Sequence, residues 1–246
     1  MAVYTVALAG NPNTGKSTLF NLLTGLRQHT GNWAGKTVDL AQGDFTHDGH
    51  EFRMIDLPGT YSLFSNSKDE EVTRDFIVFE EPDVTIVVLD ATSLERNMNL
   101  ALQVLEMTSR VVVCINLIDE AKRLGIHVDT ALLSRKLGVP VAAISARNKI
   151  GISGLLSMVA SVATGELVPE PVRVRYQEEL ERKLAVLEPA VRDTLGLRFS
   201  SRWLALRLLD EDTGLLETLR QKMKGGEFAP RKGDVSHGRS ACHNLA

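Results

Sequence analysis

The segment Gly10–Ser17 constrains this chain more than any other part of it, and its residues read Gly-Asn-Pro-Asn-Thr-Gly-Lys-Ser. It fits G-x-x-x-x-G-K-[S/T], a loop whose glycines let backbone N–H groups and a helix N-terminus converge on one phosphate. Such a loop needs a strand before it and a helix after it, and residues 4–9 and 17–23 have the required β-rich and helical character. That context makes a chance glycine turn a poor alternative. We therefore predict a nucleotide phosphate site, in which Lys16 reaches the β- and γ-phosphates and the Ser17 hydroxyl ligates Mg²⁺. The predicted residues of the loop and helix start are Gly10, Asn11, Asn13, Thr14, Gly15, Lys16, Ser17 and Thr18.

Composition places the chain among ordinary soluble globular proteins. Its 246 residues are 43% hydrophobic and 24% charged, and the formal net charge of −3 does not favour binding to nucleic acid or an anionic membrane. Its two cysteines, Cys114 in an apolar run and Cys242 in a polar tail, form no disulfide scaffold and suit a reducing compartment. No apolar run approaches the length of a membrane span, and the N-terminus lacks the layout of a signal peptide. We expect a soluble, cytosolic chain. Any segment that attaches it to a membrane would lie in further sequence.

Strand and helix signals alternate along most of the chain, which is typical of an α/β fold. The continuous valine and isoleucine runs at 84–90 and 111–116 fit strands of a parallel sheet covered on both faces. Residues 38–46 alternate weakly, and we expect them to pair antiparallel with 51–56 across the turn at 47–50. The prediction is a doubly wound, mixed and mostly parallel sheet flanked by helices. Its six strands are expected at 4–9, 38–46, 51–56, 84–90, 111–116 and 139–144, and its later helices at 69–80, 95–109, 130–138 and 152–164.

The character of the sequence changes after Gly165. The segment Val-Pro-Glu-Pro at 168–171 is typical of a linker, and apolar residues beyond it recur at helical spacing. Ser200 and Ser201 are suited to cap a second helix that carries Trp203. The C-terminal end is rich in glycine, lysine, arginine, serine and histidine and shows no periodicity. We therefore expect a nucleotide-binding domain at 1–166, a small all-helical domain at 167–224, and a disordered tail at 225–246.

A second motif, Asp56-Leu57-Pro58-Gly59, follows a predicted strand and fits D-x-x-G. After a phosphate loop, such an aspartate is expected to hold Mg²⁺ through water, and the glycine N–H to contact the γ-phosphate and report its presence. A strand-end aspartate with a Pro-Gly turn is the alternative, and the order of the two motifs favours the nucleotide interpretation. Thr37, in the loop before the second strand, is the candidate to complete the Mg²⁺ shell, and Thr30 is a poorer one.

A third motif, Asn116-Leu117-Ile118-Asp119, ends a buried strand and matches N-[K/M]-x-D with leucine in the second place. A carboxylate at Asp119 can accept from guanine N1–H and the exocyclic amine, and adenine would leave these buried polar groups unpaired. Asn116 would steady the loop and approach N7. Leu117 replaces a lysine that usually covers the base. This replacement predicts weaker affinity for the nucleotide and faster nucleotide release. The alternative is a helix-entry cap. After the last strand, a backbone N–H within Ser145, Ala146 and Arg147 is expected to contact guanine O6.

With these motifs in this order, about the first 165 residues resemble a small GTPase of the translation-factor class, which implies a Ras-like P-loop GTPase fold. The resemblance narrows to the bacterial ferrous iron transport protein B family, FeoB. It is carried by segments 10–17, 31–38, 56–63 and 70–77. The most discriminating segment reads Gly-Asn-Trp-Ala-Gly-Lys-Thr-Val at 31–38.

The same segment departs from the family pattern at two positions. Ala34 stands where proline is usual, and Lys36 stands where an apolar residue is common. Both departures concern the mobility of this switch loop more than its chemistry.

The resemblance implies a role as well as a fold. In the family, a helical domain after the GTPase domain modulates nucleotide affinity, and a polytopic membrane domain that carries Fe²⁺ follows. It therefore implies a GTP-binding and GTP-hydrolysing switch of ferrous iron uptake, at the cytoplasmic face of the bacterial inner membrane. Its ligands would be GTP or GDP with Mg²⁺, and its partner a membrane transport domain. Assembly into a homo-oligomer stays open.

Hydrolysis by such a site depends mostly on positioning and charge stabilisation. Thr60 and Tyr61 stand where Ras-like enzymes carry a water-orienting glutamine, so we expect slow intrinsic turnover. The resemblance implies that Asn13 ligates K⁺ beside the phosphates, with backbone carbonyls near Gly31 and Trp33. The alternative is that Asn13 only braces the loop. The residues expected to act in hydrolysis are Asn13, Lys16, Thr37 and Gly59.

Two other functions stay open. The first is a ribosome- or tRNA-associated, potassium-dependent GTPase, whose members share the G-x-P-N-x-G-K-S loop and usually append a basic RNA-binding module. Residues 170–224 mix acidic residues with arginines and show no aromatic–basic stripe, so we predict no nucleic-acid partner. The second is a module that senses nucleotide without turnover. Glu70 or Glu71 is a further candidate to hold the attacking water, although a solvated helix face is the simpler interpretation.

Overall fold

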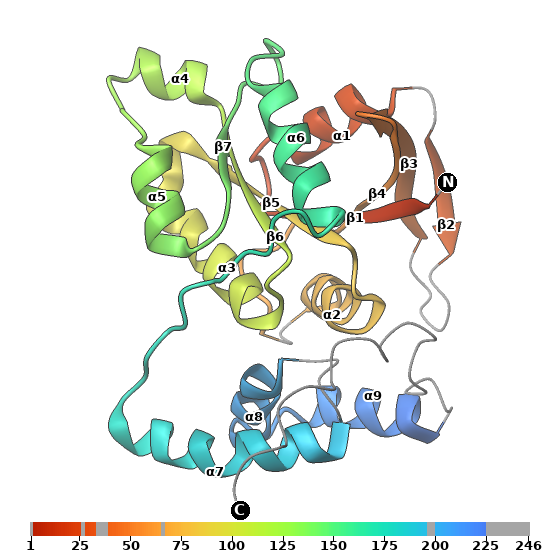
Figure 1. Ribbon diagram of the computed structural model, residues 1–246, viewed down its shortest axis with the longest axis vertical. Helices are drawn as coiled ribbons and strands as arrows, with labels where there is room; N and C mark the ends of the chain where they lie inside the picture. The colour runs from red at the N-terminus through yellow and green to blue at the C-terminus, as the bar shows by residue number, and fades with distance from the viewer. Residues whose placement is uncertain (1, 26–27, 33–38, 65–66, 196–199, 225–246) are drawn as a thin grey trace, which may run out of the picture.

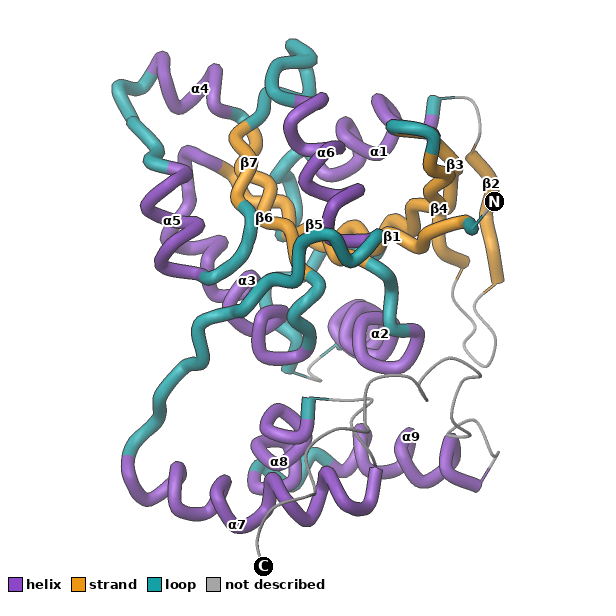
Figure 2. The backbone as a smooth tube through the Cα atoms, viewed as in Figure 1, coloured by secondary structure: helices purple, strands orange, loops and turns teal. Residues whose placement is uncertain are grey.

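The computed structural model describes residues 2–25, 28–32, 39–64, 67–195 and 200–224, which form an α/β part and a helical part (Figure 1). A seven-stranded sheet in the order β2-β3-β4-β1-β5-β6-β7 runs through the α/β part, with helices on both of its faces (Figure 2). Its strands are β1 (Val3–Gly10), β2 (Gln28–Asn32), β3 (Asp39–His47), β4 (His50–Asp56), β5 (Val84–Asp90), β6 (Val111–Asn116) and β7 (Val141–Ala143).

The strand pairing confirms the predicted mixed, mostly parallel sheet. Strand β1 pairs parallel with β4 and β5, and β6 pairs parallel with β5 and β7. Strand β3 runs antiparallel to β4 with His47 opposite His50, which confirms the hairpin. All six predicted strands are present, and β2 adds a seventh at the edge, antiparallel to β3. Residues 28–32 show no alternation of apolar and polar side chains that would predict this strand.

Helices lie close to the predicted ranges, with two differences. The helix predicted at 69–80 is divided into α2 and a π-helical turn, η1. The short helix α4 follows the third motif and was not predicted, because six residues are too few to show a 3.6-residue periodicity. The helical elements of the α/β part are α1 (Lys16–Thr24), α2 (Lys68–Asp75), η1 (Phe76–Glu80), η2 (Ala91–Ser93), α3 (Leu94–Met107), α4 (Ile118–Arg123), α5 (Thr130–Leu137) and α6 (Ile152–Ala163).

Two hydrophobic layers cover the sheet, because successive side chains of a strand point to opposite faces. On β1, Val6 and Leu8 belong to the layer formed with α1 and α6. Ala7 and Ala9 belong to the other layer, formed with α2, α3 and α5. This burial on both faces explains the near-continuous apolar character of the central strands.

The helical part packs on the layer that contains α3 and η1. Its helices are α7 (Glu178–Leu195), α8 (Ser201–Leu209) and α9 (Thr213–Lys224). Trp203 and Leu204 of α8 are buried in the same cluster as Ile77 of η1 and Leu105 of α3, so the two parts share one continuous core. Helix α8 begins as predicted after Ser200, whose Oγ accepts a hydrogen bond of 3.3 Å from the Trp203 N–H.

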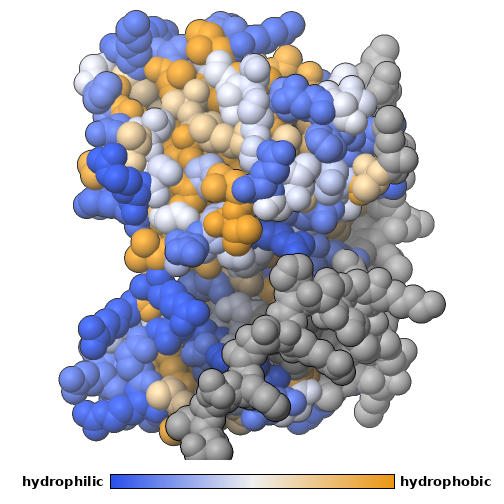
Figure 3. Space-filling view, viewed as in Figure 1, coloured by the Kyte–Doolittle hydropathy of each residue, from blue (hydrophilic) through white to orange (hydrophobic). Residues whose placement is uncertain are grey.

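The visible face of the helical part is mostly hydrophilic (Figure 3). On α7, Arg182 pairs with Glu178 and Lys183 with Glu179, each one turn apart. These exposed pairs stabilise a helix by only a few tenths of a kcal/mol each, about 0.3–0.5 kcal/mol. Over the described ranges, no helix is both long enough and apolar enough to cross a membrane.

Candidate functional site

The phosphate loop connects β1 to α1 and is shaped by two residues with positive φ. Asn13 has φ 65°, and Gly15 has φ 81° and stands directly before α1. Asparagine tolerates this left-handed region better than most residues, and glycine adopts it freely. The predicted strand–loop–helix arrangement is therefore present, and Asn13 contributes to the shape of the loop through its own backbone.

The Asn116 side chain holds the phosphate loop against the loop after β7. Its Nδ2 donates to the Thr14 carbonyl at 2.9 Å, and its Oδ1 accepts from the Ala146 N–H at 3.0 Å. Asn116 is 1% exposed, so both bonds are shielded from water. A Cβ added to Gly15 would lie 2.3 Å from Asn116 Nδ2, which leaves no room for another residue there. The three loops of the site are thus joined through one amide group.

Lys16 connects the phosphate loop to the D-x-x-G motif. Its Nζ donates to the Leu57 carbonyl at 2.6 Å and to the Asp56 carboxylate. Burial raises the pKa of Asp56, and the positive charge of Lys16 opposes this shift. A carboxylate held between burial and a single cation gains from a second positive charge nearby.

The segment after Gly59 lies against the phosphate loop. The Thr60 N–H donates to the Gly10 carbonyl at 3.3 Å, and a Cβ on Gly59 would be 3.4 Å from Pro12. The Asn11 amide and the Thr60 hydroxyl, both buried beside this contact, have no hydrogen-bond partner among the described residues. The backbone of the second motif is therefore held against the phosphate loop.

Glu70 does not lie on a solvated helix face. It is partly buried, and its Oε1 accepts a 2.8 Å hydrogen bond from the Ser62 hydroxyl. One helical turn later, the Thr73 hydroxyl donates to the Pro58 carbonyl at 3.2 Å. Helix α2 therefore contacts the D-x-x-G motif at Pro58 and the segment after it at Ser62.

Asp119 follows β6, which is separated in the sheet by β5 from β1, the strand that precedes Lys16. It lies in α4, which begins after Leu117, and Leu117 has φ 65°. The Asn148 amide donates to Asp119 Oδ2 at 2.9 Å, and the side chain of Ser145 beside it holds the pKa of Asp119 below its usual value. Asn148 was not predicted, since it lies 29 residues beyond Asp119 with no motif of its own. The one local feature that marks Asn148 is a turn, in which the Asn148 N–H donates to Ser145 Oγ at 3.3 Å.

These predicted residues meet at the carboxyl ends of β1, β4, β6 and β7, the edge where parallel α/β sheets bind ligands. Arg147 follows Ala146 on the surface, and Ser17 and Thr18 are exposed on the first turn of α1. Gly31 pairs with Leu40 in the edge hairpin, and the Thr37 and Trp33 predictions lie outside the described residues.

The side chains present suit a hard divalent cation. The Ser17 hydroxyl and the Asp56 carboxylate are oxygen donors, which Mg²⁺ prefers. The raised pKa of Asp56 is consistent with a carboxylate that would gain from a further cation. The described residues contain no cluster of three or more histidine, cysteine, aspartate or glutamate side chains that could hold a metal ion.

The loop between β1 and α1, the D-x-x-G motif after β4 and the N-x-x-D motif after β6 define a P-loop GTPase-type domain, joined here to a helical domain. Residues 4–159 match the family model for ferrous iron transport protein B, and residues 176–232 match the model for the FeoB cytosolic helical domain. The chain therefore belongs to the FeoB family, as its motifs predicted.

Individual relatives agree with this assignment. The chain is 38% identical over 216 residues to the Fe(2+) transporter FeoB of Salmonella choleraesuis, which covers 86% of this chain and 28% of that protein. A Porphyromonas gingivalis protein described as an Fe(2+) transport protein A/FeoB fusion is 35% identical over 227 residues, covering 91% of this chain and 27% of its own length. The chain thus spans about a quarter of these relatives.

Solved structures confirm the fold. The cytosolic domain of the T. maritima FeoB iron transporter in a GDP form superposes with a TM-score of 0.81 at 35% identity, covering 94% of this chain and 87% of that one. The cytosolic domain of L. pneumophila FeoB gives a TM-score of 0.76 at 35% identity, covering 87% and 86%.

Proposed function

We propose that this chain binds GTP and GDP, hydrolyses GTP, and regulates ferrous iron uptake by a longer membrane protein of which it forms the cytosolic part. The observation that carries the proposal is the Asn116 side chain, which ties the phosphate loop to the loop beside Asp119. The proposed phosphate socket and the carboxylate proposed to read guanine would thereby be held at a fixed spacing. The T. maritima relative has structures described as GDP and GMPPNP forms, which supports guanine nucleotides as the ligands.

Base recognition is tested by exchanging the donor and acceptor of Asp119. The carboxylate would accept from guanine N1–H and the exocyclic amine, whereas the amide of Asp119→Asn would suit xanthine, which carries a carbonyl in place of that amine. We expect Asp119→Asn to lose affinity for GDP and to gain affinity for xanthosine diphosphate (XDP). We expect Asp119→Ala to bind neither GDP nor XDP well. ADP is expected to bind weakly to wild type and to both variants. Equal loss of GDP and ADP in Asp119→Ala would contradict base reading by this residue.

Each proposed phosphate ligand has a defined task. Lys16 would exchange its contact with Asp56 for phosphate oxygens, and the Gly59 N–H would meet the γ-phosphate. Ser17 and Asp56, with Thr37, would hold Mg²⁺, which supplies positive charge to the transferred phosphoryl group. The full proposed nucleotide contact set is Gly10, Asn11, Asn13, Thr14, Gly15, Lys16, Ser17, Thr18, Asp56, Gly59, Asn116, Leu117, Asp119, Ser145, Ala146 and Arg147.

Potassium assistance is proposed to depend on Asn13, with backbone carbonyls of Gly31 and Trp33. The φ of 65° at Asn13 adds a requirement to its test, because alanine there would strain the loop as well as remove the carbonyl ligand. Asn13→Gly removes the side chain without that strain and is the cleaner variant. We expect wild-type turnover to be faster in KCl than in NaCl and Asn13→Gly to be equal in both. A wild type indifferent to the cation would refute potassium assistance.

Intrinsic turnover is proposed to be slow, because Thr60 replaces a water-orienting glutamine. Single-turnover phosphate release measures this rate directly. Release no faster than that of GTP in buffer would indicate a module that binds nucleotide without hydrolysing it.

We also propose a division into a G domain at 1–166, a helical domain at 167–224 that modulates nucleotide affinity, and a tail at 225–246. The ranges of the two family models, 4–159 and 176–232, support the boundary between the two domains, and the second range extends into the proposed tail. A membrane transport domain in further sequence would place the G domain at the cytoplasmic face of the inner membrane. Nucleotide off-rates of a 1–166 fragment and the full chain would test the modulation, and equal rates would contradict it.

A further inference from the structure

Residues 60–64, which follow the D-x-x-G motif, each contact another element of the protein. Two of them, Tyr61 and Leu63, contact side chains of helix α3. The other three contact the phosphate loop, α2 and α8 respectively, and are Thr60, Ser62 and Phe64. The position of this segment is therefore set by the protein around it, and α3 supplies two of the five contacts.

Gln103 of α3 holds the backbone of the segment. Its Oε1 accepts a hydrogen bond of 2.6 Å from the Leu63 N–H, and its Nε2 faces Asn99 Oδ1 at 3.5 Å. Leu63 is 2% exposed, so this N–H is shielded from water. A shielded N–H that loses its acceptor is left unpaired, which costs more than the hydrogen bond itself contributes. The bond therefore favours one position of Leu63 against α3.

Arg96 of α3 holds a side chain of the same segment. Its guanidinium carbon lies 4.7 Å from the centre of the Tyr61 ring, which is within the range of a cation–π contact. Tyr61 is 46% exposed, and it directly follows Thr60, whose N–H is bonded to the Gly10 carbonyl. A fixed Tyr61 ring therefore limits rotation of the backbone next to the bond that joins this segment to the phosphate loop.

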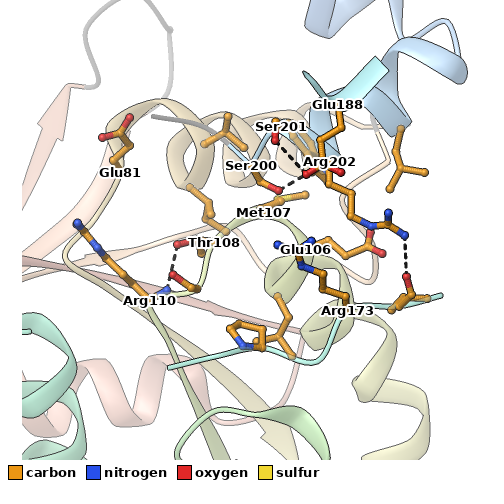
Figure 4. A pocket seen from close by; sticks show the side chains of 18 of the residues that line it. Glu81, Glu106, Met107, Thr108, Arg110, Arg173, Glu188, Ser200, Ser201 and Arg202 are labelled. Carbon is orange, nitrogen blue, oxygen red and sulfur yellow. Dashed lines mark hydrogen bonds between the residues drawn. The ribbon is translucent and has the colours of Figure 1, made fainter. Parts of the chain in front are cut away.

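Helix α3 is suited to hold this segment because the helix is itself fixed. Arg96 and Gln103 are seven residues apart, close to two full turns, so they lie along one face of α3. Near the end of the helix, Glu106 lines a cavity of about 500 Å³ at the junction with the helical domain (Figure 4). There it accepts a hydrogen bond from the Tyr176 hydroxyl. A neighbouring face of α3 is fully buried in the core, and it carries Leu100, Ala101 and Val104.

We propose that Arg96 and Gln103 are positioning residues for GTP hydrolysis, which hold the segment after D-x-x-G so that the Gly59 N–H is in place for the γ-phosphate. This role rests on the GTP hydrolysis proposed above. Neither side chain is assigned a contact with the nucleotide, and each acts through Tyr61 or Leu63. A group that is held in place before binding needs less ordering when the ligand arrives. GDP has no γ-phosphate, so the role concerns GTP and its hydrolysis and leaves GDP affinity unchanged.

The test of Gln103 uses the full chain and a matched pair of substitutions. Gln103→Met has a similar length but no oxygen acceptor, and Gln103→Glu keeps an oxygen for the Leu63 N–H. We expect Gln103→Met to slow single-turnover phosphate release about two- to tenfold, the effect of losing one neutral hydrogen bond, and Gln103→Glu to restore most of the rate. GDP affinity should be the same in all three proteins. Gln221→Met, at an exposed glutamine of α9, is the control and should match wild type.

Hydrogen exchange followed by mass spectrometry reports on the segment itself. In the chain without added nucleotide, the amides of residues 60–64 should exchange faster in Gln103→Met than in wild type, and at the wild-type rate in Gln103→Glu. Equal protection in wild type and Gln103→Met would show that the bond from Gln103 does not hold the segment.

Arg96 is exposed, so its variants keep the proposal testable if Gln103→Met does not fold. We expect Arg96→Ala to slow phosphate release about two- to fivefold, the effect of one exposed cation–π contact, and Arg96→Lys to slow it less. In a Tyr61→Leu background, Arg96→Ala should have no further effect, because its partner is gone. A full further effect there would show that Arg96 does not act through Tyr61. Arg135→Ala, at an exposed arginine of α5, is the control.

Failure of the positioning role and failure of the proposed function give different results. A wild type that binds no guanine nucleotide, or that releases no phosphate from GTP, would refute the proposed function and the positioning role with it. A wild type that hydrolyses GTP, with Gln103→Met and Arg96→Ala hydrolysing at the same rate, would refute the positioning role alone. A parallel loss of GDP affinity in these folded variants would also overturn it, because the residues would then support the site as a whole.

Discussion

Asp212 is the residue at which a single substitution should report most clearly on the junction between the domains. Arg74, in α2, is 1% exposed, and its guanidinium contacts Asp75 at 2.8 Å and Asp212 Oδ2 at 3.2 Å. The second oxygen of Asp212, Oδ1, accepts from the Leu215 N–H at 3.0 Å and so caps the start of α9. The Asp212 carboxylate thus joins α2, the helix after the D-x-x-G motif, to α9 of the helical domain.

The magnitude follows from these two contacts. A hydrogen bond to a charged group contributes about 1.5–3 kcal/mol, and a helix N-cap about 1 kcal/mol. Asp212→Ala removes both and is expected to lower the free energy of unfolding by about 2.5–4 kcal/mol. Asp212→Asn keeps an N-cap, since asparagine caps as well as aspartate, and weakens only the contact with Arg74. It is expected to cost at most about 1.5–3 kcal/mol, and the difference between the variants measures the cap together with the retained part of the Arg74 contact.

Urea unfolding followed by circular dichroism measures both values, with the slope m compared among the proteins to verify that the native states are alike. Asp210→Ala, on the neighbouring exposed residue that pairs with Arg207, is the matched control and should change stability by less than about 1 kcal/mol. If Asp212→Ala and Asp212→Asn both cost less than about 0.5 kcal/mol, the buried contact does not stabilise the junction and the reasoning fails.

Three further predictions concern the nucleotide site. Gly15→Ala should abolish GDP binding in a fluorescence titration while the protein stays folded, because φ is 81° and the new Cβ would overlap Asn116; wild-type affinity would contradict the proposed clamp. Because the pKa of Asp119 is lowered, its carboxylate stays ionised as pH falls to its ordinary pKa of about 4. The ratio of GDP affinities of wild type and Asp119→Ala, in which titration of the diphosphate and of Asp56 cancels, should therefore be flat from pH 7 to about 4 and fall below it. Asn148→Ala should move this fall to higher pH, and an unchanged profile would argue against the Asn148 contact. Leu117→Lys should slow GDP release severalfold in stopped-flow measurements, and an equal or faster rate would show that leucine does not weaken the base site.

The sheet could be predicted from the sequence because its central strands are buried on both faces. Runs such as 84–90 and 111–116 must be apolar throughout, because their side chains fill both hydrophobic layers. A continuous apolar run in the sequence therefore identifies each of them as a central strand. Strand β2 lies at the edge of the sheet and pairs only with β3. Its backbone pairing does not require an apolar pattern of side chains, so the sequence did not predict it. The helix at 69–80 divides into α2 and η1, and η1 packs in the cluster that contains α8, a long-range contact that no local pattern records.

The site was predicted as far as its chemistry is carried by contiguous motifs. Lys16 and Asp56 belong to such motifs, and the fold brings them into contact. Asn148 was missed because its partner, Asp119, is 29 residues away. The contact between Arg74 and Asp212 spans 138 residues and depends on how two domains dock, so sequence spacing has nothing to say about it.

Residues 60–64 contact both the phosphate loop and the helical domain. At the start of this segment, Thr60 is bonded to the phosphate loop. At its end, the Leu63 N–H donates to Gln103 Oε1 of α3 at 2.6 Å, and the Arg207 guanidinium of α8 lies 4.9 Å from the ring centre of Phe64. A γ-phosphate that drew in the Gly59 N–H would pull on a segment held at both ends. Its displacement must therefore break contacts with α3 and α8 or carry these helices with it, and either outcome changes the junction that Arg74 and Asp212 hold together.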